Sequence, residues 1–184
     1  MEKSKKGSKK IEFDKKDVLE IIVCTRFITL YNVINQRRFG RPWNHKQLPG
    51  LKDPPDCVSF DQSSNSQFQL EVTTSSPEEK EENALKDPPE FDGSYLATPE
   101  EIDIRIGKLF EICKGKSDNY KGRKIDLRNL TLLLDTVFFR VTGRDLENWM
   151  GRILIKDWQE KFRNLGFKDI WFVGLSRIYR LHPV

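Results

Sequence analysis

The chain has 184 residues and a mass of 21.6 kDa, which is the size of one domain. Hydrophobic residues make up 37% and aromatic residues 11%, enough to build a core, so a wholly disordered chain is excluded. The 32 basic and 28 acidic residues leave a net charge of +4, which by itself is too small to indicate a polyanionic partner.

No membrane-spanning or secreted class is expected. The longest apolar stretch, residues 18–34, is interrupted by Glu20 and Arg26. The first ten residues hold five lysines and lack the apolar run of a signal peptide. Three scattered cysteines predict neither a disulfide framework nor a zinc site, so a reducing, cytoplasmic setting is expected.

The first half of the chain predicts a basic tail, a helix and a hairpin. Residues 1–13 are interpreted as a disordered tail that precedes a single domain over residues 14–184. Apolar residues at helical spacing predict a helix from Lys15 to about Gln36, with Asp14 as its cap and a Pro- and Gly-rich loop after it. Strands are predicted at 57–61 and 67–73, and the second strand alternates apolar and polar residues.

A long acidic loop at about 74–97 separates the hairpin from the second half. Thr98, Pro99 and Glu101 predict the start of a helix that runs to about Lys116. An apolar run at 129–135 predicts a strand buried on both faces. A helix capped by Thr142 and ending near Asn164 follows, and then two strands, at 169–173 and 177–182.

The resulting order is α-β-β-α-β-α-β-β, which predicts an α/β domain with a mixed central sheet flanked by helices.

Paired carboxylates are the candidate chemistry. The chain has no phosphate-binding glycine loop, and its two histidines do not suit a catalytic triad or a zinc site. Asp56 precedes the first strand of the hairpin, and Glu71 lies inside the second, so the hairpin can place them side by side. Two carboxylates and a backbone carbonyl form a site that Mg²⁺ or Mn²⁺ accepts, and such an ion can activate water for attack on a phosphodiester.

Pro55-Asp56 followed by Glu71-Val72-Thr73 on the next strand resembles the PD-(D/E)XK nuclease superfamily, which has the restriction-endonuclease-like fold. The resemblance extends over roughly residues 15–182, and the order of elements matches the common α-β-β-β-α-β core if the strand at 129–135 follows an inserted helix. It implies a metal-dependent endonuclease with Asp56 and Glu71 as catalytic metal ligands. Glu20, a carboxylate on an otherwise apolar helix, occupies the place of the acid that many members carry on their first helix as a further ligand.

The superfamily lysine, two positions after the glutamate, is replaced here by Thr73. Some members carry this lysine on a neighbouring helix, and Lys114 is the expected substitute because it lies on the edge of the apolar face of the helix after the acidic loop. Lys116 is the next candidate, and Lys108 is expected to point to solvent.

The candidate nucleic-acid contact is a basic and aromatic segment in the loop after the first helix, which consists of Arg37, Arg38, Arg41, Trp43 and Lys46. Arg177 and Arg180 are further candidates. DNA is favoured over RNA, and a homodimer is a possible assembly. Two alternatives stay open: a non-catalytic nucleic-acid-binding or structural module that keeps the nuclease fold, and an unrelated α/β interaction protein.

Overall fold

The structure is a computed structural model that describes residues 12–48, 55–64, 66–73, 98–135, 143–155 and 157–181. Four features expected from the sequence lie wholly or mainly outside these ranges. They are the basic tail, the acidic loop at 74–97, the helix cap at Thr142, and His182 at the end of the last strand.

Six strands form one mixed sheet in which the spatial order follows the chain order. The two central pairs, β3 with β4 and β4 with β5, are parallel, and the outer pairs are antiparallel. The predicted mixed α/β architecture is therefore confirmed. The strands are β1 (Trp43–Asn44), β2 (Cys57–Phe60), β3 (Gln67–Thr73), β4 (Leu130–Asp135), β5 (Asp169–Val173) and β6 (Ile178–Arg180).

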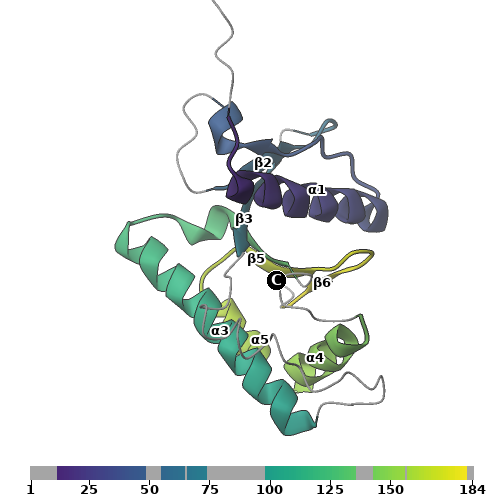
Figure 1. Cartoon of the computed structure of the whole chain (residues 1–184), viewed down its shortest axis with the longest axis vertical. Coiled ribbons are helices and arrows are strands. Elements are labelled where there is room, and N and C mark those ends of the chain that lie inside the picture. The colour runs from purple at the N-terminus through teal and green to yellow at the C-terminus, as the bar shows by residue number, and fades with distance from the viewer. Residues whose placement is uncertain are drawn as a thin grey trace, which may run out of the picture.

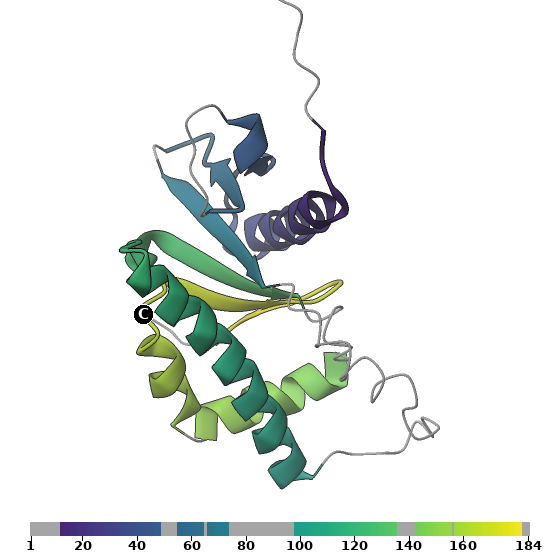
Figure 2. The ribbon, with the colours of Figure 1, turned by 60° about the vertical axis from the view of Figure 1, so that its left-hand side comes forward.

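Helices cover both faces of the sheet (Figures 1 and 2). The first helix, α1 (Lys15–Asn35), lies on one face, and the other face carries α3 (Pro99–Gly122), α4 (Gly143–Ile155) and α5 (Trp158–Arg163). Two short 3₁₀ turns, η1 (His45–Gln47) and η2 (Leu127–Asn129), precede β2 and β4.

The bounds of α1 follow from its end residues. Asp14 accepts a hydrogen bond from the backbone N–H of Asp17, and the Asp17 side chain accepts one from the N–H of Asp14, so both form a capping box. Gln36 has the left-handed conformation that ends a helix. The predicted helix is confirmed.

The sheet has a core on each side because side chains alternate along a strand. Leu132 and Leu134 of β4 pack with α3, whereas Leu133 packs with α1. The prediction that this strand is buried on both faces is confirmed. In β3, Val72 belongs to the core beneath α1, so Glu71 on the alternate side faces α3.

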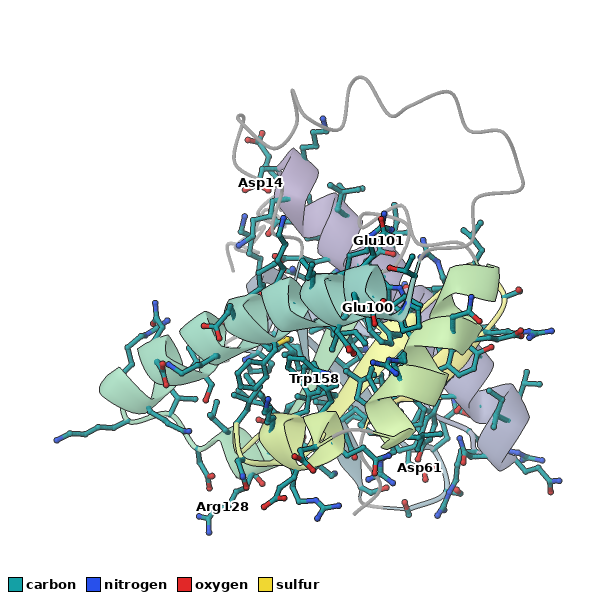
Figure 3. All side chains as sticks on the ribbon, turned by 90° about the horizontal axis from the view of Figure 1, so that it is seen from below. Asp14, Asp61, Glu100, Glu101, Arg128 and Trp158 are labelled. Carbon is teal, nitrogen blue, oxygen red and sulfur yellow. The ribbon has the colours of Figure 1, made fainter. Side chains whose placement is uncertain are left out.

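Two elements differ from the sequence prediction. β1 lies inside the predicted loop, and it is too short for a pattern because the side chains of Asn44 and Gln47 bond the nearby backbone and turn the chain after two residues. The single helix expected up to Asn164 is two helices. The break lets Trp158 of α5, labelled in Figure 3, pack against Phe110 of α3, with the ring centroids 5.9 Å apart.

One buried ion pair connects α1 to the central strand. The guanidinium of Arg26 lies 3.0 Å from Oδ1 of Asp135, and both side chains are mostly buried. Arg26→Met should lower the free energy of unfolding by about 2 kcal/mol, because it leaves the carboxylate without this partner. Urea unfolding measures the change. The exposed Arg105 is the control, and Arg105→Met should cost under about 0.5 kcal/mol; equal costs for the two variants would contradict the prediction.

Candidate active site

The hairpin of β2 and β3 brings Asp56 and Glu71 together. Cys57 pairs with Leu70 across the two strands, so Asp56 and Glu71 lie one position beyond this pair. The Oδ2 atom of Asp56 accepts a hydrogen bond of 2.8 Å from the backbone N–H of Val72. Both carboxylates are buried, with Asp56 4% and Glu71 2% exposed. The expected carboxylate pair is therefore present at the junction of the two strands.

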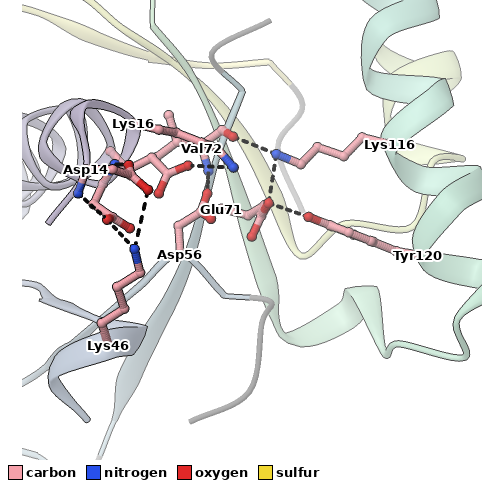
Figure 4. A network of polar contacts seen from close by, with 10 residues as sticks. Asp14, Lys16, Lys46, Asp56, Glu71, Val72, Lys116 and Tyr120 are labelled. Atoms are coloured by element: carbon pink, nitrogen blue, oxygen red, sulfur yellow. Dashed lines mark hydrogen bonds and ion pairs between the residues drawn. The ribbon is translucent and has the colours of Figure 1, made fainter. Parts of the chain in front are cut away.

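One oxygen of Glu71 is held from α3 (Figure 4). The Tyr120 hydroxyl donates a hydrogen bond to Oε1 of Glu71, and the ammonium of Lys116 lies 2.7 Å from the same oxygen. Lys116 also donates a hydrogen bond of 2.6 Å to the carbonyl oxygen of Val72. The two α3 side chains thus fix the orientation of the Glu71 carboxylate.

The prediction that Lys114 reaches the carboxylates is wrong. Its ammonium pairs with Asp118 at 2.7 Å on the exposed side of α3. The prediction took Phe110 as the reference for the buried face, but that face continues through Cys113 to Tyr120. On a helix with about 100° per residue, position 116 lies about 60° from Cys113 and about 40° from Tyr120, whereas position 114 lies about 100° from Cys113.

Tyr120 was missed because the helix was expected to end near Lys116, whereas α3 continues to Gly122. A signal was present in the sequence. Ser117 and Tyr120 continue the spacing of the buried residues Leu109 and Cys113 by one further turn. The polar character of Ser117 and the lysines around it obscured this pattern.

Glu20 on α1 is the third expected acid. It is buried, and its carboxylate forms an ion pair of 3.3 Å with Lys16 one turn earlier. Burial raises the pKa of Glu20, and the Lys16 ammonium opposes that rise. Glu20 is close enough for its charge to act on Asp56.

Asp56 has a strongly raised pKa. Burial, and then the negative charge of Glu71, raise its pKa to about 8, although the Lys116 ammonium acts in the opposite direction. A buried carboxylate pair of this kind repels itself unless a proton or a cation compensates the charge.

On the α3 side of β3, two buried oxygens have no hydrogen-bond partner within the part of the chain that the structure describes: Oε2 of Glu71 and Oγ1 of Thr73. Buried polar atoms are nearly always paired, so these oxygens are suited to an additional ligand. A hard divalent cation fits a carboxylate oxygen beside a second carboxylate. Across the described residues, however, no three His, Cys, Asp or Glu side chains form a metal-binding group. The donors therefore fit an ion that binds two carboxylates and keeps several waters.

The basic segment expected to contact nucleic acid is divided by the fold. Arg37 and Arg38 are exposed beyond the end of α1. The guanidinium of Arg41 stacks over the ring of Trp43 at 4.1 Å from its centroid. Lys46 instead pairs with Asp14 and Asp17 at the start of α1, so its charge is largely compensated.

Comparison of the chain with models of known protein families, with curated protein sequences and with solved structures finds no match. Among the described helices, none combines the length and the apolar character needed to cross a bilayer.

Metal-free stability should depend on the protonation of Asp56. The folded pKa of about 8 exceeds the ordinary value of 3.8, so this group stabilises the fold fully below about pH 4 and loses that contribution as the pH rises through 8. In chelator, the melting temperature should fall between pH 5 and 9. The fall should be smaller in Asp56→Asn, whose amide oxygen still accepts from Val72.

The control is Asp118→Asn, because this exposed carboxyl has a lowered pKa and does not titrate between pH 5 and 9. Its melting curves should retain the pH dependence of the unmodified protein. An Asp56→Asn variant with the same pH dependence as the unmodified protein would contradict the assignment of a raised pKa to Asp56.

Proposed function

We propose that the protein is a metal-dependent nuclease that hydrolyses phosphodiester bonds of nucleic acid, as the resemblance to the PD-(D/E)XK superfamily implies. The observation that carries the proposal is the buried pair of Asp56 and Glu71. The ammonium of Lys116 lies against this pair, and one oxygen of Glu71 has no partner among the described residues. Acid, acid and lysine are the three groups of the superfamily motif, here with the lysine on α3.

The order of elements supports the same reading. The elements α1, β1, β2, β3, α3 and β4 follow the α-β-β-β-α-β order of the superfamily core, and β1 supplies the strand that the sequence did not predict. The acids lie on the antiparallel pair β2 and β3, next to the parallel strand β4. We therefore propose the restriction-endonuclease-like fold for this domain.

Asp56 and Glu71, with the carbonyl of Val72, would hold Mg²⁺ or Mn²⁺, and Glu20 would add negative charge behind them. When bound, such an ion activates water and stabilises the charge on the attacked phosphate. Before an ion binds, the Asp56 carboxyl keeps its proton over most of the neutral range because of its raised pKa. Binding would exchange that proton for a cation.

Lys116 would stabilise the negative charge that develops on the phosphate. An ammonium has three N–H donors, and here one faces Glu71 and another faces the Val72 carbonyl. The third is left for a phosphate oxygen, so the two protein contacts would orient the lysine toward the substrate. Its side chain is 22% exposed, which gives the substrate access to it.

DNA is the preferred substrate in this proposal. Arg37, Arg38 and Arg41 would contact phosphates, because all three are exposed and lie in the segment that leads into β1 and the active-site hairpin. The Arg41 plane stacked on Trp43 would offer a flat surface for a base.

A non-catalytic nucleic-acid-binding module is the second candidate, favoured by two observations. The described residues contain no group of three metal-binding side chains, and Lys116 already compensates the charge of Glu71 from within the chain. Such a module would bind DNA equally well in chelator and in Mg²⁺, and would leave plasmid, linear DNA and RNA intact under both conditions.

Glu71→Gln should lower cleavage by at least about 100-fold, because the amide keeps the size of the side chain but replaces an anionic ligand by a neutral one. Plasmid, linear DNA and RNA are incubated with Mg²⁺, with Mn²⁺ and with chelator, and the products are separated on gels. Thermal melting verifies that the variant is folded. Undiminished cleavage by a folded Glu71→Gln protein would overturn the nuclease proposal.

Two lysines on the same helix give a matched pair of variants. Lys116→Ala should reduce cleavage by about 100-fold because it removes the charge beside Glu71, whereas Lys114→Ala should leave the rate nearly unchanged. Initial cleavage rates at saturating metal measure both. A larger loss in Lys114→Ala than in Lys116→Ala would exclude the role assigned to Lys116.

A further inference from the structure

The helix α1 is apolar on two sides. Its inner side supplies Val23, Cys24, Phe27 and Ile28 to the core. Its outer side also carries large apolar residues: Val18, Ile22 and Val33 are 45%, 47% and 74% exposed. A helix that covers a sheet normally carries polar and charged residues on its outer face, so this second apolar side is unusual.

The outer side also lacks exposed charge. From Val18 to Ile34 the only charged residues are Glu20, which is buried, and Arg26, which is mostly buried against Asp135. The exposed positions of α3, the helix on the opposite face, include Arg105, Lys108, Glu111, Lys114, Asp118 and Lys121. In a chain with 33% charged residues, a charge-free strip of this length indicates a contact surface.

The strip has the symmetry of a contact with its own copy. Its exposed residues are, in order, Val18, Ile22, Thr25, Thr29 and Val33. The order of residue types is nearly the same when it is read backwards. An antiparallel pair of helices around a two-fold axis near Thr25 would place Val18 against Val33 of the other copy and Ile22 against Thr29. The small Thr25 side chains at the centre allow close approach.

Charges at the two ends of α1 favour the antiparallel arrangement. The same register brings Asp14, at the start of the helix, opposite Arg37, just beyond its end, and does so twice in a symmetric dimer. Both residues are exposed. A parallel arrangement would instead oppose Asp14 to Asp14 and Arg37 to Arg37. Antiparallel helix dipoles also attract, whereas parallel ones repel.

We propose that the outer face of α1 is the contact surface of a symmetric homodimer in which the two α1 helices pack antiparallel. Figure 2 shows α1 on its own side of the sheet, away from α3, α4 and α5, so a second copy would approach a face that these helices do not reach. One helix pair is smaller than a standard protein interface, so micromolar affinity is expected. The inference does not depend on the proposed nuclease activity.

Sedimentation velocity of the full chain at rising concentration tests the proposal. The unmodified protein should change from monomer to dimer in the micromolar range, and Val33→Asp should remain a monomer. The control is Ile104→Asp, because Ile104 is 61% exposed on α3 and its change should leave the dimer intact. A monomer at all concentrations, or a dimer that persists in Val33→Asp, would overturn the proposal.

Cysteine cross-linking tests the antiparallel register. The three native cysteines are buried, so they give little background. Under oxidation, Thr25→Cys should form a disulfide-linked dimer, and Val33→Cys should do so only when mixed with Val18→Cys. Efficient self-linking of Val33→Cys alone would indicate a parallel pair and contradict the inferred arrangement. Cleavage activity is not used as a readout, so failure here is distinct from failure of the nuclease proposal.

Discussion

The shared contact of Lys116 and Tyr120 with one oxygen of Glu71 is the interaction on which the site depends. It joins β3 to α3 and fixes the carboxylate, whose second oxygen has no partner among the described residues. Without the ammonium, Glu71 and Asp56 would be two buried acids near a third acid, Glu20, an arrangement that proteins avoid. The position of α3 on the sheet therefore determines the chemistry of the hairpin.

Charge compensation explains why so many acids tolerate burial near the start of α1 and the end of β3. Glu20 is paired with Lys16, Asp17 with Lys46, and Glu71 with Lys116, so three acids each have a lysine partner. Asp56 instead accepts a hydrogen bond from the backbone N–H of Val72, and its pKa is raised to about 8. In the proposed reaction, a divalent cation would replace the proton of this carboxyl.

Much of the fold follows from local patterns in the sequence. The caps Asp14 and Thr98 start α1 and α3 as predicted, and the alternation of residues 67–73 predicts β3. The position of the lysine could not be derived in the same way, because a small error in the reference face of a helix moves a long side chain from the core to solvent. The break between α4 and α5 depends on tertiary packing of Trp158 on Phe110, which no local pattern records.

We propose that Asp56 and Glu71 together form a divalent-cation site, and direct binding of Mn²⁺ tests this proposal. Electron paramagnetic resonance of free Mn²⁺, titrated with the full chain, counts bound ions independently of any cleavage. We expect saturable binding at one dominant site. The double variant Asp56→Asn with Glu71→Gln should abolish this binding while it remains folded. Absence of binding to the unmodified protein, or binding unchanged in the folded double variant, would contradict it.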